Sequence, residues 1–429
     1  MYVCGPTVYD YAHIGNARPV VVFDVLYRLL KTTYSKITYV RNITDIDDKI
    51  NAKASESGED IRTITERTAD IYHRDMAALN ALKPDVEPRA TDHVAEMIDM
   101  IESLLEKNFA YEAQGHVLFS VSSWDGYGKL SGHNRDEIIA GARVEVAPYK
   151  KDAADFVLWK PSTGGEPGWE SPWGFGRPGW HLECSAMSGK YLGKEFDIHG
   201  GGQDLIFPHH ENEIAQSRCS HGTESMAHTW MHNGYLMVEG EKMSKSLGNF
   251  YTVHDLLEEF PGEAIRLALL KAHYRQPLDF TKDGIREAKK ELDRWYRAVD
   301  TVSADDGEIS ESVKEALFDD LNTPRAIAAL HELDPGGSPA NGTVALKMKR
   351  DLKASANFLG LLNESAKDWF KGAGGEGALD EAAIENLIAQ RIEARASKDF
   401  AESDRIRDEL AGQGVILEDG AEGTTWRRE

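Results

Sequence analysis

The first fifty residues place short apolar runs on either side of a longer segment with helical spacing. Tyr2-Val3-Cys4 is apolar and is followed by Gly-Pro-Thr at 5–7, which is typical of a buried strand before a tight turn. From about residue 17 the spacing predicts a helix, with Pro19 in its first turn. Its apolar positions are Phe23, Leu26, Leu29 and Leu30. A second strand is predicted at 37–43, so the chain opens as strand, helix, strand.

The periodicity changes character twice more along the chain. Long helical stretches are predicted at about 60–82 and 93–107, followed by a strand at 116–121 within a segment rich in glycine and proline. A parallel-sheet pattern resumes at Phe196, with a strand at 235–238 and a helix from about Val253. Helical segments then dominate, including one at 264–273.

The end of the chain predicts a separate small module. Pro-Gly-Gly-Ser-Pro at 335–339 breaks the helical pattern, and Gly-Ala-Gly-Gly-Glu-Gly at 372–377 is typical of a flexible linker. Two helices at 384–396 and 400–412 are then expected, followed by Gly-Val-Ile-Leu-Glu-Asp at 414–419 and by Gly-Thr-Thr-Trp-Arg-Arg at 423–428.

Composition bounds the class of protein. A chain of 429 residues is expected to form two or three domains, and 41% hydrophobic with 28% charged residues is ordinary for a soluble protein. No apolar run is long enough to span a membrane, and Met1 leads directly into a strand rather than a signal peptide. Three cysteines fit a reducing cytoplasm better than a disulfide framework.

The net charge is acidic, at −23. Composition alone would therefore not select a nucleic-acid-binding protein, although net charge is not local potential. Basic residues do cluster at 289–290, 294–297 and 347–350, but charge runs of this kind are commonly solvated helix faces.

His-Ile-Gly-Asn at 13–16 lies where the first strand passes into the first helix. A helix N-terminus offers free N–H groups and partial positive charge, which suit a phosphate. Gly15 would let a base or ribose approach closely, and His13 and Asn16 could donate to phosphate oxygens. A surface histidine in an ordinary strand–turn–helix would show the same short pattern.

Lys-Met-Ser-Lys-Ser at 242–246 follows the strand at 235–238 and is flanked by glycines. Two lysines three residues apart predict a mobile cationic loop. Attack of a carboxylate on an α-phosphate builds negative charge on the phosphoryl oxygens and on the departing pyrophosphate, which Lys242 and Lys245 could neutralise. A solvated lysine loop is the alternative.

The cysteines suggest a metal site together with Phe-Pro-His-His-Glu-Asn-Glu at 207–213. If a helix begins after Pro208, His209 and Glu213 share one face. With Cys4 and Cys184 they would form a plausible zinc set of two thiolates, one imidazole and one carboxylate. The spacing matches no standard zinc motif, and buried cysteines are usually inert core residues, so both interpretations stay open.

Seven segments together resemble cysteinyl-tRNA synthetases, a family of class I aminoacyl-tRNA synthetases whose HIGH and KMSKS signatures match 13–16 and 242–246. The segments follow the family's order, and the similarity extends to Glu429. They are Cys-Gly-Pro-Thr-Val-Tyr at 4–9, His-Ile-Gly-Asn-Ala-Arg at 13–18, Asn-Ile-Thr-Asp-Ile-Asp-Asp-Lys at 42–49, Gly-Trp-His-Leu-Glu-Cys-Ser at 179–185, His-Gly-Gly-Gly-Gln-Asp-Leu at 199–205, Phe-Pro-His-His-Glu-Asn-Glu at 207–213 and Lys-Met-Ser-Lys-Ser at 242–246.

The resemblance implies ATP-dependent activation of L-cysteine to cysteinyl-adenylate and its transfer to tRNA(Cys), with Mg²⁺ accompanying ATP. It implies a single Zn²⁺ that holds the substrate thiolate and discriminates against serine without an editing domain. The implied zinc ligands are Cys4, Cys184, His209 and Glu213, and the implied cysteine-binding residues are Gly5, Thr44 and Trp180. The implied catalytic residues are His13, Asn16, Lys242 and Lys245, and the implied ATP-binding residues are Gly15, Asp204 and Lys245.

The resemblance also implies the fold class, which is α/β. A Rossmann-like parallel-sheet catalytic domain would span 1–262 with an insertion at about 108–176, followed by a tRNA-binding helical bundle at 263–371 and an anticodon-binding domain at 372–429. We expect a cytoplasmic monomer with no membrane association. Members of the family usually carry a further segment before the first strand, so we expect one to be missing ahead of Met1.

Four residues of the last domain are candidates for reading the anticodon: Arg395, Asp404, Asp419 and Trp426. Carboxylates can accept hydrogen bonds from base amino groups, and an aromatic ring or an arginine plane can stack on an unpaired base. A helical hairpin with surface ion pairs is the alternative.

Two other functions share part of this pattern. A cysteine ligase of the mycothiol pathway, which joins cysteine to an amino sugar, would not need the C-terminal module. A non-catalytic paralogue that binds tRNA or cysteine would not need His13, Lys242 and Lys245.

Overall fold

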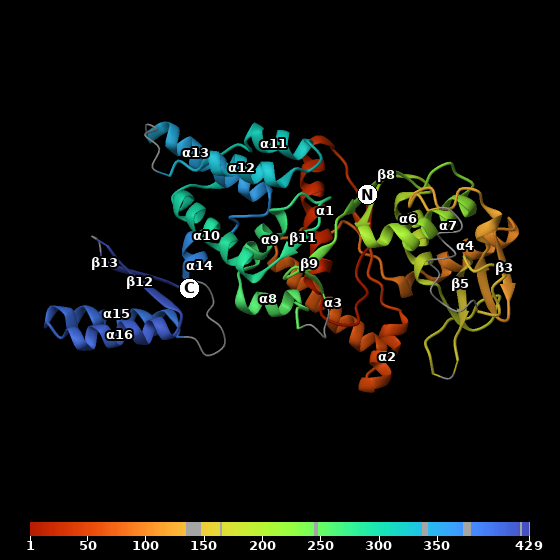
Figure 1. The fold of residues 1–429 in the computed structure, drawn as a ribbon, viewed down its shortest axis with the longest axis horizontal. Helices are drawn as coiled ribbons and strands as arrows, with labels where there is room; N and C mark the ends of the chain where they lie inside the picture. The colour runs from red at the N-terminus through yellow and green to blue at the C-terminus, as the bar shows by residue number, and fades with distance from the viewer. Residues whose placement is uncertain are drawn as a thin grey trace. The chain divides into compact units, whose positions relative to one another are not determined.

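The computed structural model describes residues 1–133, 147–163, 165–243, 248–336, 342–371, 379–420 and 423–428. They divide into two compact units. The first comprises Met1–Lys282 with Ala316–Pro324, and the second comprises Asp283–Glu315 with Arg325–Glu429. Figure 1 shows the elements of both units along the colour gradient of the chain.

A four-stranded parallel sheet lies at the centre of the first unit, with strand order β2-β1-β7-β8. The strands are β1 (Tyr2–Val3), β2 (Val40–Arg41), β7 (Phe196–Gly202) and β8 (Ala227–Asn233). Because β2 and β7 lie on opposite sides of β1, the sheet changes winding direction there, and ligands of such sheets bind at the carboxyl ends of the strands beside this point. The predicted α/β class is confirmed, although the strand expected at 37–43 is limited to Val40–Arg41.

Helix α1 (Ile14–Thr33) begins three residues earlier than the periodicity predicts. His13 is its N-cap residue, and the side-chain oxygen of Asn16 accepts a hydrogen bond from the backbone N–H of His13 at 3.2 Å. The side chain of Asn16 thus closes the first turn. Residues 14–16 therefore form the beginning of the helix rather than the loop before it.

The segment between β2 and β7 adds helices and an antiparallel sheet. The sheet has the order β3-β4-β5-β6, and Val117, Phe119 and Trp159 from its strands lie in one apolar core with α4 and α6. The helices are α2 (Asp48–Ser57), α3 (Ile61–Ala78), α4 (Val94–Glu106) and α6 (Trp180–Leu192), and the strands are β3 (Ala110–Ala113), β4 (His116–Phe119), β5 (Phe156–Pro161) and β6 (Gly176–Pro178).

The rest of the first unit carries a small three-stranded sheet with the order β10-β9-β11. Strands β9 (Leu236–Val238) and β10 (Glu241–Lys242) are antiparallel, and β11 (Leu278–Phe280) pairs with β9 in parallel. The accompanying helices are α7 (Glu211–His221), α8 (Val253–Glu259) and α9 (Gly262–Leu270).

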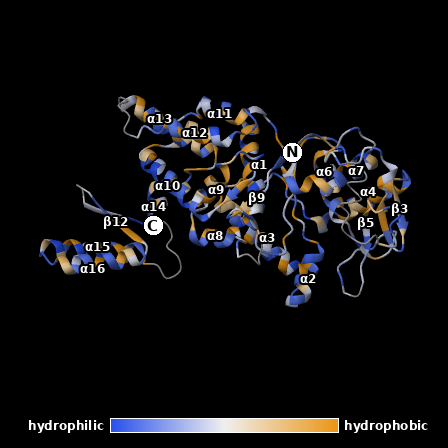
Figure 2. Ribbon diagram, in the orientation of Figure 1, coloured by the Kyte–Doolittle hydropathy of each residue, from blue (hydrophilic) through white to orange (hydrophobic). Residues whose placement is uncertain are grey.

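The second unit is mainly helical and ends in a small module. It contains most of each of the helices α10 (Lys282–Val299), α11 (Glu311–Phe318) and α12 (Thr323–Leu333). It also contains α13 (Gly342–Phe358), α14 (Ala366–Lys371), α15 (Glu381–Ala396), α16 (Phe400–Gly412), β12 (Val415–Gly420) and β13 (Gly423–Arg428). In the module, α15 and α16 lie side by side (Figure 1), and hydrophilic and hydrophobic residues alternate along both (Figure 2). The linker predicted at 372–377 and most of the break at 335–339 lie outside the described residues.

Many of the basic side chains predicted to be solvated do form ion pairs. Lys289 pairs with Asp293 at 3.5 Å, and Lys347 pairs with Asp351. Within the ranges that the structure describes, no helix is both long and apolar enough to cross a membrane.

Gly200 on β7 is required by its close packing against Phe23 of α1. A Cβ at this position would lie 2.2 Å from Cζ of Phe23, whose side chain is fully buried. We expect Gly200→Ala to lower the free energy of unfolding by about 1–3 kcal/mol, because either the sheet or the ring must shift. Denaturant titration checks this, with Gly342→Ala as the control, since a Cβ at Gly342 meets nothing within 4 Å. An equal effect of both substitutions would contradict the packing argument.

Candidate active site

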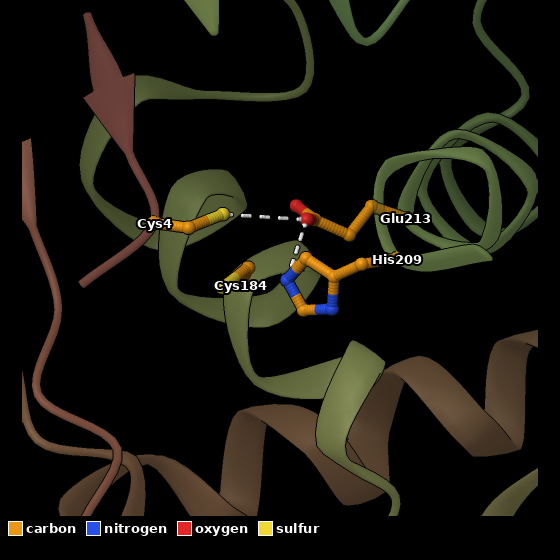
Figure 3. A group of neighbouring side chains, drawn as sticks. All are labelled: Cys4, Cys184, His209 and Glu213. Carbon is orange, nitrogen blue, oxygen red and sulfur yellow. Dashed lines mark hydrogen bonds and ion pairs between the residues drawn. The ribbon is translucent and has the colours of Figure 1, made fainter. Parts of the chain in front are cut away.

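Four potential metal ligands meet at the carboxyl end of β1 (Figure 3). The ligand atoms of Cys4, Cys184, His209 and Glu213 all lie within 4.8 Å of one another. Cys184, His209 and Glu213 are buried, and Cys4 is half-buried. Two sulfur atoms, one nitrogen and one oxygen form a donor set suited to a borderline-soft divalent metal such as zinc.

The local fold explains how distant residues converge. Cys4 directly follows β1, where its backbone N–H donates to the carbonyl of Gly200 on β7 at 3.2 Å. Cys184 lies on α6. His209 precedes α7 and Glu213 lies in its first turn, so the four-residue spacing brings His209 Nε2 to 3.0 Å from Glu213 Oε1, as the helical prediction required.

Burial and mutual contact set the charges of the cluster. Burial, together with the neighbouring Cys184 and Glu213, raises the pKa of Cys4 well above its usual range. The thiol of Cys4 lowers the pKa of Cys184 to about 6. Burial opposes ionisation of Glu213, but His199 and His209 hold the pKa of its carboxyl well below its usual value. The cluster therefore favours one thiolate and one carboxylate, which are both good metal ligands.

A second donor set overlaps the first and was not anticipated from the sequence. Cys4, His199, His210 and Glu213 also lie within 4.8 Å of one another. His199 Nε2 is 2.8 Å from Glu213 Oε2, and His210 Nε2 is 3.4 Å from Cys4 Sγ. Both histidines belong to segments already noted at 199–205 and 207–213, so the signal was present but the contacts depend on the fold.

One observation favours the first set as the metal-binding one. It contains two sulfur atoms rather than one, which better suits zinc. A second nitrogen contact does not separate the two sets, because Nδ1 of His209 lies 2.8 Å from Nδ1 of His181 and Nδ1 of His210 lies 2.8 Å from Nε2 of His232.

The predicted cysteine-binding residues lie near this cluster with different exposure. A Cβ on Gly5 would lie 1.6 Å from the carbonyl oxygen of Asn42, so no other residue fits there. Thr44 is buried and donates through Oγ1 to Glu183 at 2.7 Å; the helix after it is capped by Asp47 rather than by Thr44. Trp180 is 43% exposed, and its ring lies against His209 with a centroid distance of 4.4 Å.

The buried side-chain amide of Asn42 links these residues by hydrogen bonds, and the sequence alone assigns it no role. The side-chain oxygen of Asn42 accepts from the backbone N–H of Gly5 at 2.9 Å and lies 3.7 Å from Sγ of Cys184. Its amide nitrogen donates to Thr44 Oγ1 at 3.2 Å. Asn42 therefore fixes the strand ends that carry the cluster.

The first signature segment lies beside residues 251–253 and beside Met243, which belongs to the described part of the second segment. Ile14 N–H donates to the carbonyl of Tyr251 at 3.0 Å, and Val253 N–H donates to that of Ala12 at 2.8 Å. A Cβ on Gly15 would lie 3.0 Å from Cε of Met243. Lys242 lies on β10, whereas Lys245 lies outside the described residues.

The ring of His13 lies against that of Phe250 at this junction, with a centroid distance of 5.5 Å. Burial lowers the pKa of its imidazole, although the nearby Asp204 opposes the shift. Within the described part of the chain, its Nδ1 is buried and has no hydrogen-bond partner.

Asp204 follows β7, whose glycines form strand rather than the simple loop typical of such runs. A Cβ on Gly202 would lie 2.3 Å from Oδ1 of Asp204, so the glycine is needed for this orientation of the carboxylate.

Comparison with known proteins identifies the chain's relatives. The model for the "tRNA synthetases class I (C) catalytic domain" matches residues 1–290. The cysteine–tRNA ligase of Paramagnetospirillum magneticum is 63% identical over 434 residues, covering 100% of this chain and 94% of the relative. That of Rhodospirillum rubrum is 61% identical over 433 residues, with coverages of 100% and 94%.

The chain belongs to the cysteine–tRNA ligase family. The class I fold is confirmed by a solved structure of Mycobacterium tuberculosis methionyl-tRNA synthetase in complex with methionyl-adenylate. It aligns with a TM-score of 0.57 and 16% identity, covering 86% of this chain and 92% of that one.

The second unit also matches family models. A DALR domain matches residues 312–363, and the cysteinyl-tRNA ligase anticodon-binding domain matches residues 380–427. The first of these regions is helical from α11 to α13, and the second contains α15, α16, β12 and β13.

The four candidates for anticodon contact in this member of the cysteine–tRNA ligase family differ in exposure and in the ion pairs that they already form. Asp419 pairs with Arg395 at 3.0 Å and with Arg391 at 2.9 Å, and the Arg391 contact lowers the pKa of its carboxyl. Asp404 is exposed and pairs with Arg407 at 3.3 Å. These contacts are the surface ion pairs expected if the segment is simply a helical hairpin.

Trp426 is buried in this structure. Its ring is only 5% exposed and lies in the module's apolar core, with Nε1 donating to Glu385 at 2.8 Å. The ring stabilises the module in this conformation and presents little face to a base.

Proposed function

We propose that this chain is an ATP-dependent cysteine–tRNA ligase that activates L-cysteine and transfers it to tRNA(Cys). The observation that carries the proposal is the donor set of Cys4, Cys184, His209 and Glu213, which lies on the same sheet edge as the N-terminus of α1. A thiol-binding metal centre beside a phosphate-binding helix terminus is what selective activation of cysteine requires.

The donor set fits a zinc ion, with Cys4, Cys184, His209 and Glu213 as its ligands. When bound, zinc would supply a Lewis acid that lowers the pKa of the substrate thiol and favours thiolate over a serine hydroxyl. Around it, Gly5 permits the close approach of the Asn42 carbonyl at the strand end, and Thr44 orients Glu183. The exposed ring of Trp180 would cover the bound amino acid from the solvent side.

The N-terminus of α1 would receive ATP. Its free N–H groups and the imidazole of His13 would stabilise charge on the phosphates, while Asn16 fixes the first turn and Gly15 leaves space for the nucleotide. Asp204 would accept hydrogen bonds from the ribose hydroxyls. Lys242 and Lys245 would neutralise the charge that forms as the cysteine carboxylate attacks the α-phosphate, with Mg²⁺ arriving together with ATP.

The domain roles follow the same proposal. Residues 1–262 form the catalytic domain with an insertion at about 108–176, residues 263–371 form a tRNA-binding helical bundle, and residues 372–429 bind the anticodon. In this last part Arg395, Asp404 and Asp419 would exchange their ion pairs for base contacts. We also propose a cytoplasmic location, because both cluster thiols must stay reduced to bind a metal. A monomer is proposed with it, from the family resemblance alone.

Charging of total tRNA with labelled cysteine tests the proposal, with serine and zinc content measured on the same sample. We expect cysteine charging with about one zinc per chain. Serine charging should be lower by on the order of 10⁴-fold, because serine lacks the group that the site binds. Cysteine-dependent ATP–pyrophosphate exchange without charging would favour the amino-sugar ligase instead. Neither activity would favour a binding paralogue.

A further inference from the structure

Arg18, in the second turn of α1, carries a buried guanidinium with an unusual environment. Its side chain is only 1% exposed, and burial lowers its pKa to about 10. Among the described residues, no carboxylate lies within ion-pair distance of it. Burying a charge without an opposite charge costs free energy, so other interactions must stabilise the guanidinium.

Backbone carbonyls take the place of a carboxylate. One terminal nitrogen donates to Gly234 at 2.7 Å and to Tyr235 at 2.6 Å. The other donates to Gln276 at 2.6 Å, with longer contacts of 3.4 Å to His273 and Tyr274. The planar guanidinium fork therefore joins two chain segments, 234–235 and 273–276, to the same helix.

These two segments are also joined to each other. Gly234 N–H donates to the carbonyl of Tyr274 at 2.7 Å, and Leu278 N–H donates to that of Tyr235 at 3.0 Å. A Cβ on Gly234 would lie 2.7 Å from the carbonyl oxygen of Gln276, so the contact tolerates only glycine. We call this joint of 234–235 with 273–276 the carbonyl joint.

The carbonyl joint is the root of the hairpin that leads into the lysine segment. Strand β9 begins at Leu236 and β11 at Leu278, directly after the two halves of the joint. Strand β10 pairs back on β9, with Lys242 opposite Met237. At the other end of the connection, Arg18 lies five residues after His13 on one continuous helix.

We propose that Arg18 is a positioning residue that fixes the hairpin of Lys242 relative to the N-terminus of α1. It acts through the carbonyl joint and touches neither substrate nor ATP. The inference rests on the proposed function, because the two groups that it aligns are those assigned to phosphate chemistry. The alternative hypothesis is a purely structural role, in which Arg18 only stabilises the fold.

Arg18→Met tests the inference by steady-state ATP–pyrophosphate exchange. We expect kcat to fall about 100-fold, because a displacement of roughly 1 Å between catalytic groups has this effect. The KM for cysteine and the zinc content should stay within about twofold, because the metal cluster lies on other elements. Arg18→Lys should restore only part of kcat, since an ammonium has three donors and cannot bridge both segments.

Two further variants separate positioning from stability. Gly234→Ala disturbs the carbonyl joint from its other side and should produce the same selective loss of kcat even if Arg18→Met does not fold. Arg266→Met is the matched control, because Arg266 is also fully buried but pairs with Asp24 and Leu79. It should lower the melting temperature while the folded fraction keeps its kcat.

Retention of kcat by folded Arg18→Met and Gly234→Ala would overturn the inference, as would an equal loss of zinc and of cysteine affinity. An inactive wild-type protein would instead contradict the proposed function, so the two failures are distinguishable.

Discussion

Removing the thiol of Cys184 is expected to abolish both metal binding and cysteine activation. Losing a residue that merely supports a metal ligand lowers affinity about 10- to 100-fold, so losing a ligand itself should reduce exchange activity on the order of 1000-fold or more. Cys184→Ala should carry well below one zinc per chain when measured by atomic absorption. Circular dichroism should show that the sheet and helices remain.

Cys219 provides the matched control for this experiment. It is also a buried thiol, and burial raises its pKa to about 12, but it is not part of either donor set. Cys219→Ala should therefore keep its zinc and its activity. If Cys184→Ala also keeps one zinc per chain, the ion is held by Cys4, His199, His210 and Glu213, and the ligand assignment proposed above is wrong.

The cluster was partly predictable because two of its members are close in sequence. His209 and Glu213 are four residues apart, and helical geometry alone places them on one face. Cys4 and Cys184 meet them only because β1 pairs with β7 and because α6 lies against α7. The spacing of these residues along the chain does not predict that pairing. The assignment of Cys4 and Cys184 as metal ligands therefore depended on the family resemblance.

The positions of Arg18 and Trp426 depend on burial in the folded chain, which the local sequence pattern does not determine. Arg18 is a charged residue in the second turn of a helix, where solvent exposure is the usual expectation, yet the loops around it remove it from water. The sequence pattern leaves Trp426 free to face a base, but in the structure it packs with the aliphatic side chains of the module's core, such as Ile384 and Leu410. The start of α1 was misplaced for a local reason, because Asn16 caps its own first turn.

The second large effect is expected for His13→Ala, which should lower kcat for ATP–pyrophosphate exchange about 100- to 1000-fold. Burial keeps the imidazole neutral near pH 7, so it acts as a fixed hydrogen-bond donor rather than as a cation. Its Nδ1 is buried without a partner among the described residues, which suits a group that gains its partner when ATP binds. Zinc content and the KM for cysteine should change little, because His13 contacts no member of the metal cluster in the described structure.

His254 is a suitable control, because it lies on α8 near the same junction and its ring contacts Tyr11 at a centroid distance of 4.9 Å. It pairs with Asp75 at 3.4 Å and is exposed enough to be replaced without opening a cavity. His254→Ala should retain activity within about twofold, as surface substitutions usually do. If His13→Ala is folded, zinc-loaded and still comparably active, the N-terminus of α1 does not bind the reacting phosphates. The lysine loop would then have to stabilise that charge alone, and removing Lys245 would become the decisive substitution.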